Sequence, residues 1–275
     1  MSETEHQKPE SWLWHLLGLI NPGIVLASNI VGGYWVASGV IYMLGLGPLL
    51  DMFFGRASKP KPPRESGRPF EALLYVHAFV QFAVLGTLMY RASIDGAAWT
   101  TWVAAVSTGI SSGVSGIIVA HELGHTKKGS FSWWVGRANL FSVLYLHFTT
   151  EHNFTHHKHV STVKDPATAL RGESLWWFIG RTVPGQFRDA AAVHHRKGKT
   201  GFRNPVYRGL LLQIALVAGL FAAFGPWITG AFVAQAAFAI FLLEYINYIR
   251  HYGLLRDVGE RQTEMHSWQS EERWS

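Results

Sequence analysis

The feature that most constrains this chain is a series of six apolar stretches, each close to the ~20 residues that a helix needs to cross a bilayer. Charged residues are rare within them: Asp51 lies near the end of the second stretch, Glu71 at the start of the third and Glu244 within the sixth. Only 15% of all residues are charged, against roughly 25% in an average soluble domain. We therefore predict an all-α, polytopic membrane protein with six transmembrane helices. The stretches are Trp12–Ile30, Tyr34–Phe54, Phe70–Tyr90, Trp99–Ala120, Leu210–Ile228 and Ala231–Ile249.

Lys and Arg are distributed unevenly over the segments that connect these stretches. The connection after the second stretch and the long segment 121–208 are rich in both, whereas the connection after the third holds only Arg91. Because basic connections stay in the cytoplasm, this alternation predicts a bacterial-type inner-membrane protein with both termini cytoplasmic. The net charge of +6 is spread over membrane-flanking segments, so no nucleic-acid partner is expected. The basic residues after the second stretch are Arg56, Lys59, Lys61, Arg64 and Arg68.

The segment Phe131–Phe148 is long enough for a seventh crossing but is not expected to make one. Arg137 and Asn139 lie near its middle, and an arginine there costs about 2.5–3.5 kcal/mol on insertion scales. The pair Trp133–Trp134 is typical of the membrane interface. We predict a helix that lies in, or dips into, the cytoplasmic interface, which keeps the histidines before and after it on one side of the membrane.

Two histidines four residues apart follow the fourth stretch, in the sequence HELGH. On a continuing helix His121 and His125 lie on one face with a rise of ~6 Å, so both imidazoles can reach one metal ion. The same residues match the HExxH pattern of zinc proteases, in which Glu122 would be the general base. Taken alone, this box leaves a membrane zinc peptidase open.

A second histidine cluster, EHNFTHHKH, covers residues 151–159. His152 and His156 repeat the four-residue spacing, and His157 adds a neighbouring imidazole that is expected to point elsewhere. Five imidazoles in two clusters exceed what one tetrahedral zinc ion with an open position uses. The chain has no cysteine, which excludes thiolate ligands, and imidazole accommodates iron as well as zinc. The count favours a site with two metal ions.

His251 follows the sixth stretch and is predicted to be a sixth ligand, because the fifth and sixth stretches form a hairpin that returns to the same side. Glu244 lies two helical turns earlier on the same face, where its carboxylate either orients an imidazole or pairs within the bundle. His77, inside the third stretch, is expected to hydrogen-bond another helix. His6, His15, His194 and His195 are expected to be surface residues, and His147, His159 and His266 are not predicted to be ligands.

Four motifs together resemble the integral-membrane alkane 1-monooxygenase family, within the histidine-box di-iron membrane desaturase and hydroxylase superfamily. They are HELGH (121–125), EHNFTHHKHVSTVKDPAT (151–168), GESLWWF (172–178) and NYIRHYGLLR (247–256). The resemblance implies six transmembrane helices around a cytoplasmic, non-haem di-iron site with nine histidines. The matched ligands are His121, His125, His152, His156, His157 and His251, and the acidic residues expected to support them are Glu122, Glu151, Glu244 and Asp165.

The resemblance also implies an activity: hydroxylation of the terminal carbon of medium-chain alkanes by O₂. Electrons would come from rubredoxin, itself reduced by rubredoxin reductase, and the alkane would enter from the bilayer. Strong aliphatic C–H bonds yield to no acid–base side chain, so a redox metal is needed. A basic cytoplasmic face would attract an acidic electron carrier.

The chain departs from the family pattern in two places. Arg250 stands where the family usually has glutamate, and a positive charge beside a metal site is unfavourable unless it points away. The third box, H-x-x-H-H, is expected beyond residue 275. We expect residues 1–275 to be a single membrane-embedded domain that lacks its C-terminal portion; the alternative is an inactive form.

Three other interpretations stay open. The same histidines would suit a fatty-acyl desaturase or decarboxylase, or a xylene-type methyl monooxygenase. A membrane zinc peptidase would use HELGH alone, with about one zinc ion and no iron. A non-catalytic membrane scaffold descended from such an enzyme would bind no metal.

Overall fold

The computed structural model describes residues 11–54 and 66–268, and every regular element within them is helical. The basic residues Arg56, Lys59, Lys61 and Arg64, on which the predicted orientation depends, lie outside this part of the chain, as does His6. The α-helices are α1 (Ile20–Val31), α2 (Ser38–Val40), α3 (Gly47–Phe54), α4 (Arg68–Asp95), α5 (Trp99–Ser111), α6 (Val119–Gly124), α7 (Phe131–Ser142), α8 (Phe148–Glu151), α9 (His157–His159), α10 (Leu175–His195) and α11 (Pro205–His251). The other helical segments are η1 (Trp12–Leu19), η2 (Gly33–Ala37), η3 (Ile41–Leu46), η4 (Ser112–Ile118), η5 (His152–His156), η6 (Gly201–Arg203) and η7 (Glu264–His266); η3, η4 and η5 are π-helical and the rest are 3₁₀.

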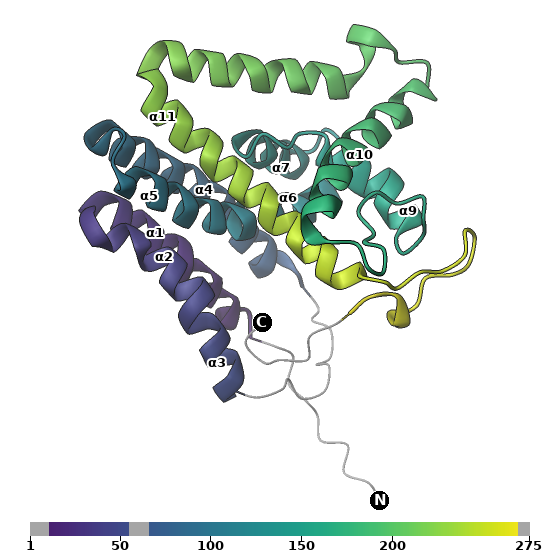
Figure 1. Cartoon of the computed structure of the whole chain (residues 1–275), viewed down its shortest axis with the longest axis horizontal. Coiled ribbons are helices and arrows are strands. Elements are labelled where there is room, and N and C mark those ends of the chain that lie inside the picture. Colours follow the sequence, from purple (N-terminus) through teal and green to yellow (C-terminus); the bar gives the residue numbers. More distant parts are fainter. Residues whose placement is uncertain (1–10, 55–65, 269–275) are drawn as a thin grey trace, which may run out of the picture.

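Five continuous helical runs are long and apolar enough to cross a membrane. The first four, Trp12–Val31, Gly33–Phe53, Arg68–Asp95 and Trp99–Gly124, each contain most of one predicted stretch. The fifth and sixth predicted stretches both lie in α11, whose 47 residues would extend ~70 Å if straight, about twice the hydrocarbon core. Instead α11 reverses direction, as Figure 1 shows, because Gly225 adopts a non-helical backbone (φ 78°, ψ −171°) directly before Pro226.

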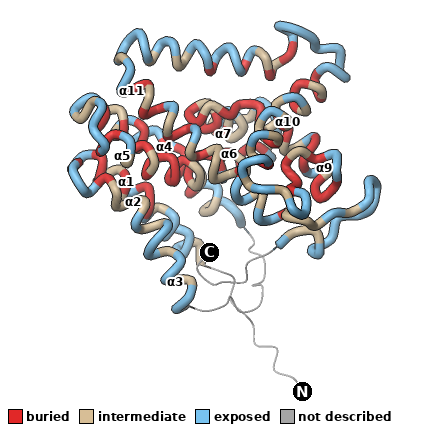
Figure 2. The backbone as a smooth tube through the Cα atoms, viewed as in Figure 1, coloured by how far each residue is buried: buried red, intermediate tan, exposed pale blue. Residues whose placement is uncertain are grey.

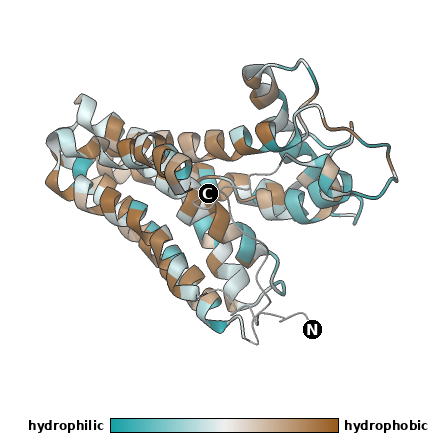
Figure 3. Cartoon of the chain, turned by 90° about the horizontal axis from the view of Figure 1, so that it is seen from below, coloured by the Kyte–Doolittle hydropathy of each residue, from teal (hydrophilic) through white to brown (hydrophobic). Residues whose placement is uncertain are grey.

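The buried residues lie in the middle of this bundle (Figure 2), and many large apolar side chains on its outside are exposed. Phe79 is 63% exposed, Leu44 57% and Phe221 58%, all on the long helices. Figure 3 shows hydrophobic residues along these helices, and hydrophilic residues gathered at the end that holds α9, α10 and the C-terminal loops. Such an exterior suits lipid tails, so the fold is that of a multi-pass membrane protein.

Polar side chains inside the bundle are paired between helices. His77 Nδ1 lies 3.0 Å from Ser115 Oγ, which confirms the hydrogen bond between helices predicted for it. Gln81 Nε2 donates to Ser112 Oγ at 2.9 Å, and that hydroxyl donates to Gln235 Oε1 at 2.8 Å. These bonds join α4, η4 and α11, because a polar group in an apolar interior must find its partner within the protein.

The segment after the first histidine box forms a short helix, α7, and then a turn. At 12 residues α7 is ~18 Å long, too short to cross the hydrocarbon core. The expected single helix over Phe131–Phe148 is wrong: α7 ends at Ser142, and Leu144 adopts the left-handed conformation (φ 56°). The Arg137 guanidinium donates a hydrogen bond to the Leu146 carbonyl and lies 5.0 Å from the centroid of the Trp133 ring. Both contacts stabilise its positive charge.

Helices α5 and α11 approach closely along small residues of α5. A Cβ added to Gly109 would lie 2.7 Å from Phe238 Cβ and 2.8 Å from the Gln235 carbonyl oxygen. Glycine is therefore required for this approach, as in other membrane helix pairs. The run that begins with α5 continues through η4 into α6, so the helical run that contacts α11 also leads to the first histidine box.

We expect Gly109→Ala to destabilise the protein by about 1–3 kcal/mol, because neither backbone nor Cβ can move aside cheaply. Gly113→Ala, one helical turn later and facing the same helix, is the matched control, since its nearest neighbour is Leu242 Cδ1 at 3.5 Å. Thermal unfolding in detergent measures both. Equal melting temperatures for the two variants would contradict the close approach at Gly109.

Candidate metal centre

The first histidine box lies at the end of α6. His121 is within the helix and His125 directly follows its last residue, and the two Nε2 atoms lie 3.2 Å apart. The carboxylate of Glu122 lies 3.0 Å from His121 Nδ1 and occupies that nitrogen. The Nε2 atoms of both rings therefore face each other, as the four-residue spacing predicts for two donors to one ion.

The second histidine box is π-helical, which changes which of its residues share a face. In η5 and the start of α9 a turn takes more than four residues, so His152 aligns with His157 instead of His156. The ring centroids of His152 and His157 are 4.4 Å apart, and those of His152 and His156 are 5.2 Å apart. The expectation that His157 points elsewhere is wrong for this reason.

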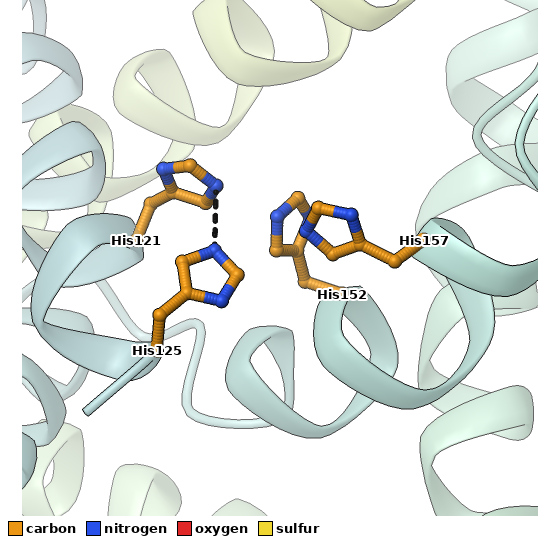
Figure 4. Close-up of side chains that lie close together, drawn as sticks. All are labelled: His121, His125, His152 and His157. Carbon is orange, nitrogen blue, oxygen red and sulfur yellow. Dashed lines mark hydrogen bonds between the residues drawn. The ribbon is translucent and has the colours of Figure 1, made fainter. Parts of the chain in front are cut away.

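The two boxes meet in space, and four imidazoles point toward one another (Figure 4). One ligand nitrogen from each of His121, His125, His152 and His157 lies within 4.8 Å of all the others. The short α7 and the turn after it return the chain to α6, which is why the boxes lie on the same side of the bundle. His121 and His152 are half-buried, whereas His125 and His157 are exposed, so the cluster is open on one side.

The electrostatics favour neutral imidazoles at His152 and His157, whose pKa values burial lowers. Burial lowers the pKa of His152 far below its ordinary value, and the neighbouring imidazoles lower it further. Burial and the neighbouring imidazoles also lower the pKa of His157. His152 Nε2 is buried without a hydrogen-bond partner. A neutral ring with an unused lone pair is the form that binds a metal ion, so the residues present fit a cation.

His156 and His251 form a separate pair beside the four. Their ring centroids are 5.4 Å apart, and both residues are buried. His156 Nδ1 lies 3.0 Å from Asp165 Oδ2. Burial alone would raise the pKa of Asp165, but hydrogen bonds from His156, Thr168 and the Ala167 amide hold it below its ordinary value. Asp165 is thus a carboxylate that fixes one imidazole, whereas His251 reaches the centre only through its contact with His156.

The other acidic candidates have different surroundings. Glu244 is fully buried and accepts hydrogen bonds from Tyr145, Thr182, Gln186 and Asn247, none of which is an imidazole. It therefore pairs within the bundle. Glu151 is 1% exposed and its Oε1 has no hydrogen-bond partner. Burial raises the pKa of Glu151 well above its ordinary value, and the charges of Asp165, Glu244 and Asp189 raise it further.

Several buried residues were not predicted to support a site. His147 is buried against Tyr145, and burial lowers its pKa to about 4. His194 was expected at the surface but is only 8% exposed, because α10 packs it inward. Ser161 and Thr168 are fully buried beside Asp165, where the only sequence signal was a threonine three residues after an aspartate. Arg250 is exposed, so the side chain that breaks the family pattern reaches solvent.

Comparison with known proteins identifies the family of enzymes to which this chain is similar. Residues 97–275 match the fatty acid desaturase family, whose members are enzymes, and this range includes all four motifs. The alkane 1-monooxygenase 1 of Alcanivorax borkumensis is 34% identical over 96% of this chain and 70% of its own length. The alkane 1-monooxygenase 1 of Pseudomonas aeruginosa is 36% identical over 94% of this chain and 73% of its own length.

The chain therefore belongs to the alkane 1-monooxygenase family, a family of oxidoreductases. It spans roughly two thirds to three quarters of the length of these relatives, from 65% for the Pseudomonas putida enzyme to 73%. A more distant relative is the xylene/toluene monooxygenase hydroxylase component of Pseudomonas putida, 29% identical over 57% of this chain and 44% of its own length.

We expect His152→Ala to weaken metal binding more than about tenfold, because it removes the buried nitrogen at the centre of the cluster. Metal content after anaerobic equilibration with Fe²⁺ measures the effect. His195→Ala is the control, since His195 is exposed and outside the cluster. Equal iron content in the two variants would contradict a metal centre at this cluster.

The raised pKa of Glu151 predicts a pH dependence of stability. The folded protein binds this proton more tightly than the unfolded chain, whose carboxyl titrates near 4.5, so the free energy of unfolding falls as pH rises above that value toward the raised pKa. Glu151→Gln stays neutral and should flatten this slope in metal-free protein, measured by denaturant unfolding between about pH 5 and about pH 8. Exposed Glu264→Gln should leave the slope unchanged; a slope unaffected by Glu151→Gln would count against a protonated carboxyl.

Proposed function

We propose that this chain is a di-iron membrane monooxygenase that hydroxylates the terminal carbon of medium-chain alkanes. The overall reaction takes R–H, O₂, two electrons and two protons to R–OH and water. The observation that carries the proposal is the cluster of four imidazole nitrogens within 4.8 Å of one another, in a chain 34–36% identical to named alkane 1-monooxygenases.

The residues proposed to hold the metal are the six predicted histidines. Four of them, His121, His125, His152 and His157, surround one position. His156 and His251 form a neighbouring pair that would serve a second ion. All donors are imidazole nitrogens, which suit iron. When bound, a pair of irons supplies the redox chemistry that activates O₂ and attacks an unactivated C–H bond.

The protein's own groups prepare the site for this chemistry. The lowered pKa values of His152 and His157 favour neutral rings, so their ligand nitrogens need not lose a proton before they bind a metal ion. Glu122 and Asp165 occupy the Nδ1 atoms of His121 and His156, so Nε2 is the nitrogen that each ring would present to a metal ion. Phe148 stacks on His152 with ring centroids 4.9 Å apart and keeps water from that side of the ring. The raised pKa of the buried Glu151 carboxyl favours a proton on it beside the second box, where the reaction would consume protons.

The proposed topology has six crossings, with the two arms of α11 on either side of Gly225 counted separately. The histidine end would then face the cytoplasm of an inner membrane, with both termini on that side, and residues 1–275 would form one membrane-embedded domain. Exposed Lys127, Lys128, Lys158 and Lys164 adjoin the two boxes. Their charge supports rubredoxin, reduced by rubredoxin reductase, as the electron donor, since an acidic carrier would be attracted to this face.

Two alternatives are separated by specific observations. The xylene/toluene relative favours methyl hydroxylation of an aromatic ring as the second candidate. A zinc peptidase is disfavoured because Glu122 hydrogen-bonds a ligand histidine instead of facing a metal-bound water, and because the cluster contains more histidines than one zinc ion with an open position uses.

We expect membranes containing this protein to convert octane to 1-octanol when supplied with rubredoxin, its reductase, NADH and isotopically heavy O₂. Mass spectrometry should find one heavy oxygen atom in the alcohol. His152→Ala should form no product and His195→Ala should retain activity. An alkene from octane, or turnover of xylene alone, would replace the proposal by its alternatives, and about one zinc without iron would overturn it.

A further inference from the structure

Ser161 lies at the junction of hydrogen bonds that reach two histidines far apart in the sequence. Its backbone is in the left-handed conformation, φ 60°, which is uncommon for a residue with a side chain. It is also completely buried. Backbone strain of this kind persists only where the surroundings fix the residue, so its partners are informative.

One branch of these bonds leads to His156. The Ser161 amide donates to Thr168 Oγ1 at 2.8 Å, and the Thr168 hydroxyl donates to Asp165 Oδ2 at 2.7 Å. The same carboxylate oxygen lies 3.0 Å from His156 Nδ1. Each of these residues is less than 10% exposed, so water does not compete for the bonds.

The other branch leads to His251, at the end of α11. The Ser161 hydroxyl donates to the His266 carbonyl oxygen at 2.7 Å, and that oxygen lies 3.5 Å from His251 Nδ1. The Trp268 amide also donates to the Arg250 carbonyl at 2.8 Å, which holds the segment around His266 against the end of the helix. The Ser161 carbonyl accepts from the Arg256 amide at 2.7 Å, so the junction is tied to the chain after α11 as well.

The directions of these bonds follow from the chemistry of the groups. A hydroxyl has one hydrogen, and Thr168 gives its hydrogen to Asp165 while accepting from the Ser161 amide. An ionised carboxylate and a backbone carbonyl can only accept. The hydrogen in each remaining contact must therefore be on Nδ1 of His156 and of His251. In a neutral ring with its hydrogen on Nδ1, Nε2 carries no hydrogen and is the nitrogen available to a metal ion.

We infer that Ser161 is a positioning residue that fixes the tautomer and orientation of both His156 and His251, through its amide on one branch and its hydroxyl on the other. The inference rests on the metal centre proposed above and deepens it. One buried residue thereby links a ligand from the second histidine box to a ligand from the end of α11. The two rings, with centroids 5.4 Å apart, are presented together.

Three substitutions test the branches separately in the full chain. Thr168→Val keeps the size of the side chain and removes the hydroxyl on the His156 branch. Ser161→Ala removes only the hydroxyl on the His251 branch and leaves the amide. Thr168→Ser keeps the hydroxyl and should restore the wild-type result. Thr229→Val is the matched control, because Thr229 is buried and its hydroxyl donates to the Gly225 carbonyl, away from the centre.

Two measurements report the outcome. In metal-free protein, nitrogen NMR of labelled histidines, assigned by replacing each histidine in turn, should show loss of the Nδ1–H tautomer at His156 in Thr168→Val and at His251 in Ser161→Ala. Titration with Co²⁺, followed by its visible absorption, should show each variant binding about 10- to 100-fold more weakly, as is typical when a group that orients a ligand is lost. Thr168→Ser and Thr229→Val should behave as wild type in both measurements.

Unchanged tautomers in both variants would overturn the inference. So would a loss of Co²⁺ binding that is equal in Thr229→Val, or that Thr168→Ser does not restore, because both results indicate a general structural role. If Thr168→Val does not fold, Ser161→Ala alone decides. Failure of the wild type to bind Co²⁺ would overturn the proposed metal centre, whereas the tautomers, measured without metal, would still decide the role of Ser161.

Discussion

The crowding of four imidazoles at one end of a helical bundle is the constraint on which the rest of this structure depends. Four ligand nitrogens lie within 4.8 Å of one another, and His152 Nε2 is buried without a partner. A buried polar atom left unpaired costs about 1–3 kcal/mol, and a bound cation removes that cost. The fold thus holds together four imidazoles whose clustering is unfavourable without a metal ion and becomes favourable around a bound cation.

The surrounding structure provides the rigidity that such a cluster needs. At Gly109 the helices α5 and α11 approach so closely that no larger side chain fits between them. Beneath the cluster, the Glu244 carboxylate joins α11 to α10 and to Tyr145 through four hydrogen-bond partners. A network in which each member is paired resists rearrangement in a low-dielectric interior. Among the described residues, unpaired buried atoms recur at the second histidine box, at Glu151, His152 and Thr155.

Regular periodicity made part of this structure predictable. The apolar stretches reappear as long helices because segments in lipid must satisfy their own backbone hydrogen bonds. The geometry of HELGH followed from the α-helical repeat, since α6 is regular up to Gly124. The same argument gave a wrong result for the second box. Because η5 is π-helical, its turn contains one more residue, and His157 instead of His156 lies beside His152 in the cluster. The predicted helix was also too long, because the sequence contains no glycine or proline to indicate the left-handed backbone at Leu144, just after the end of α7.

The sequence by itself determined an all-helical membrane protein, the two histidine boxes and the residue types available to a metal. These depend on local properties, namely apolar length and the spacing of imidazoles along a helix. Only the tertiary structure decided which nitrogens converge, that Glu244 supports the bundle and not an imidazole, and that Ser161 connects His156 to His251. Hydrogen bonds between residues distant in the chain carry no periodic signal, because they depend on how whole helices pack.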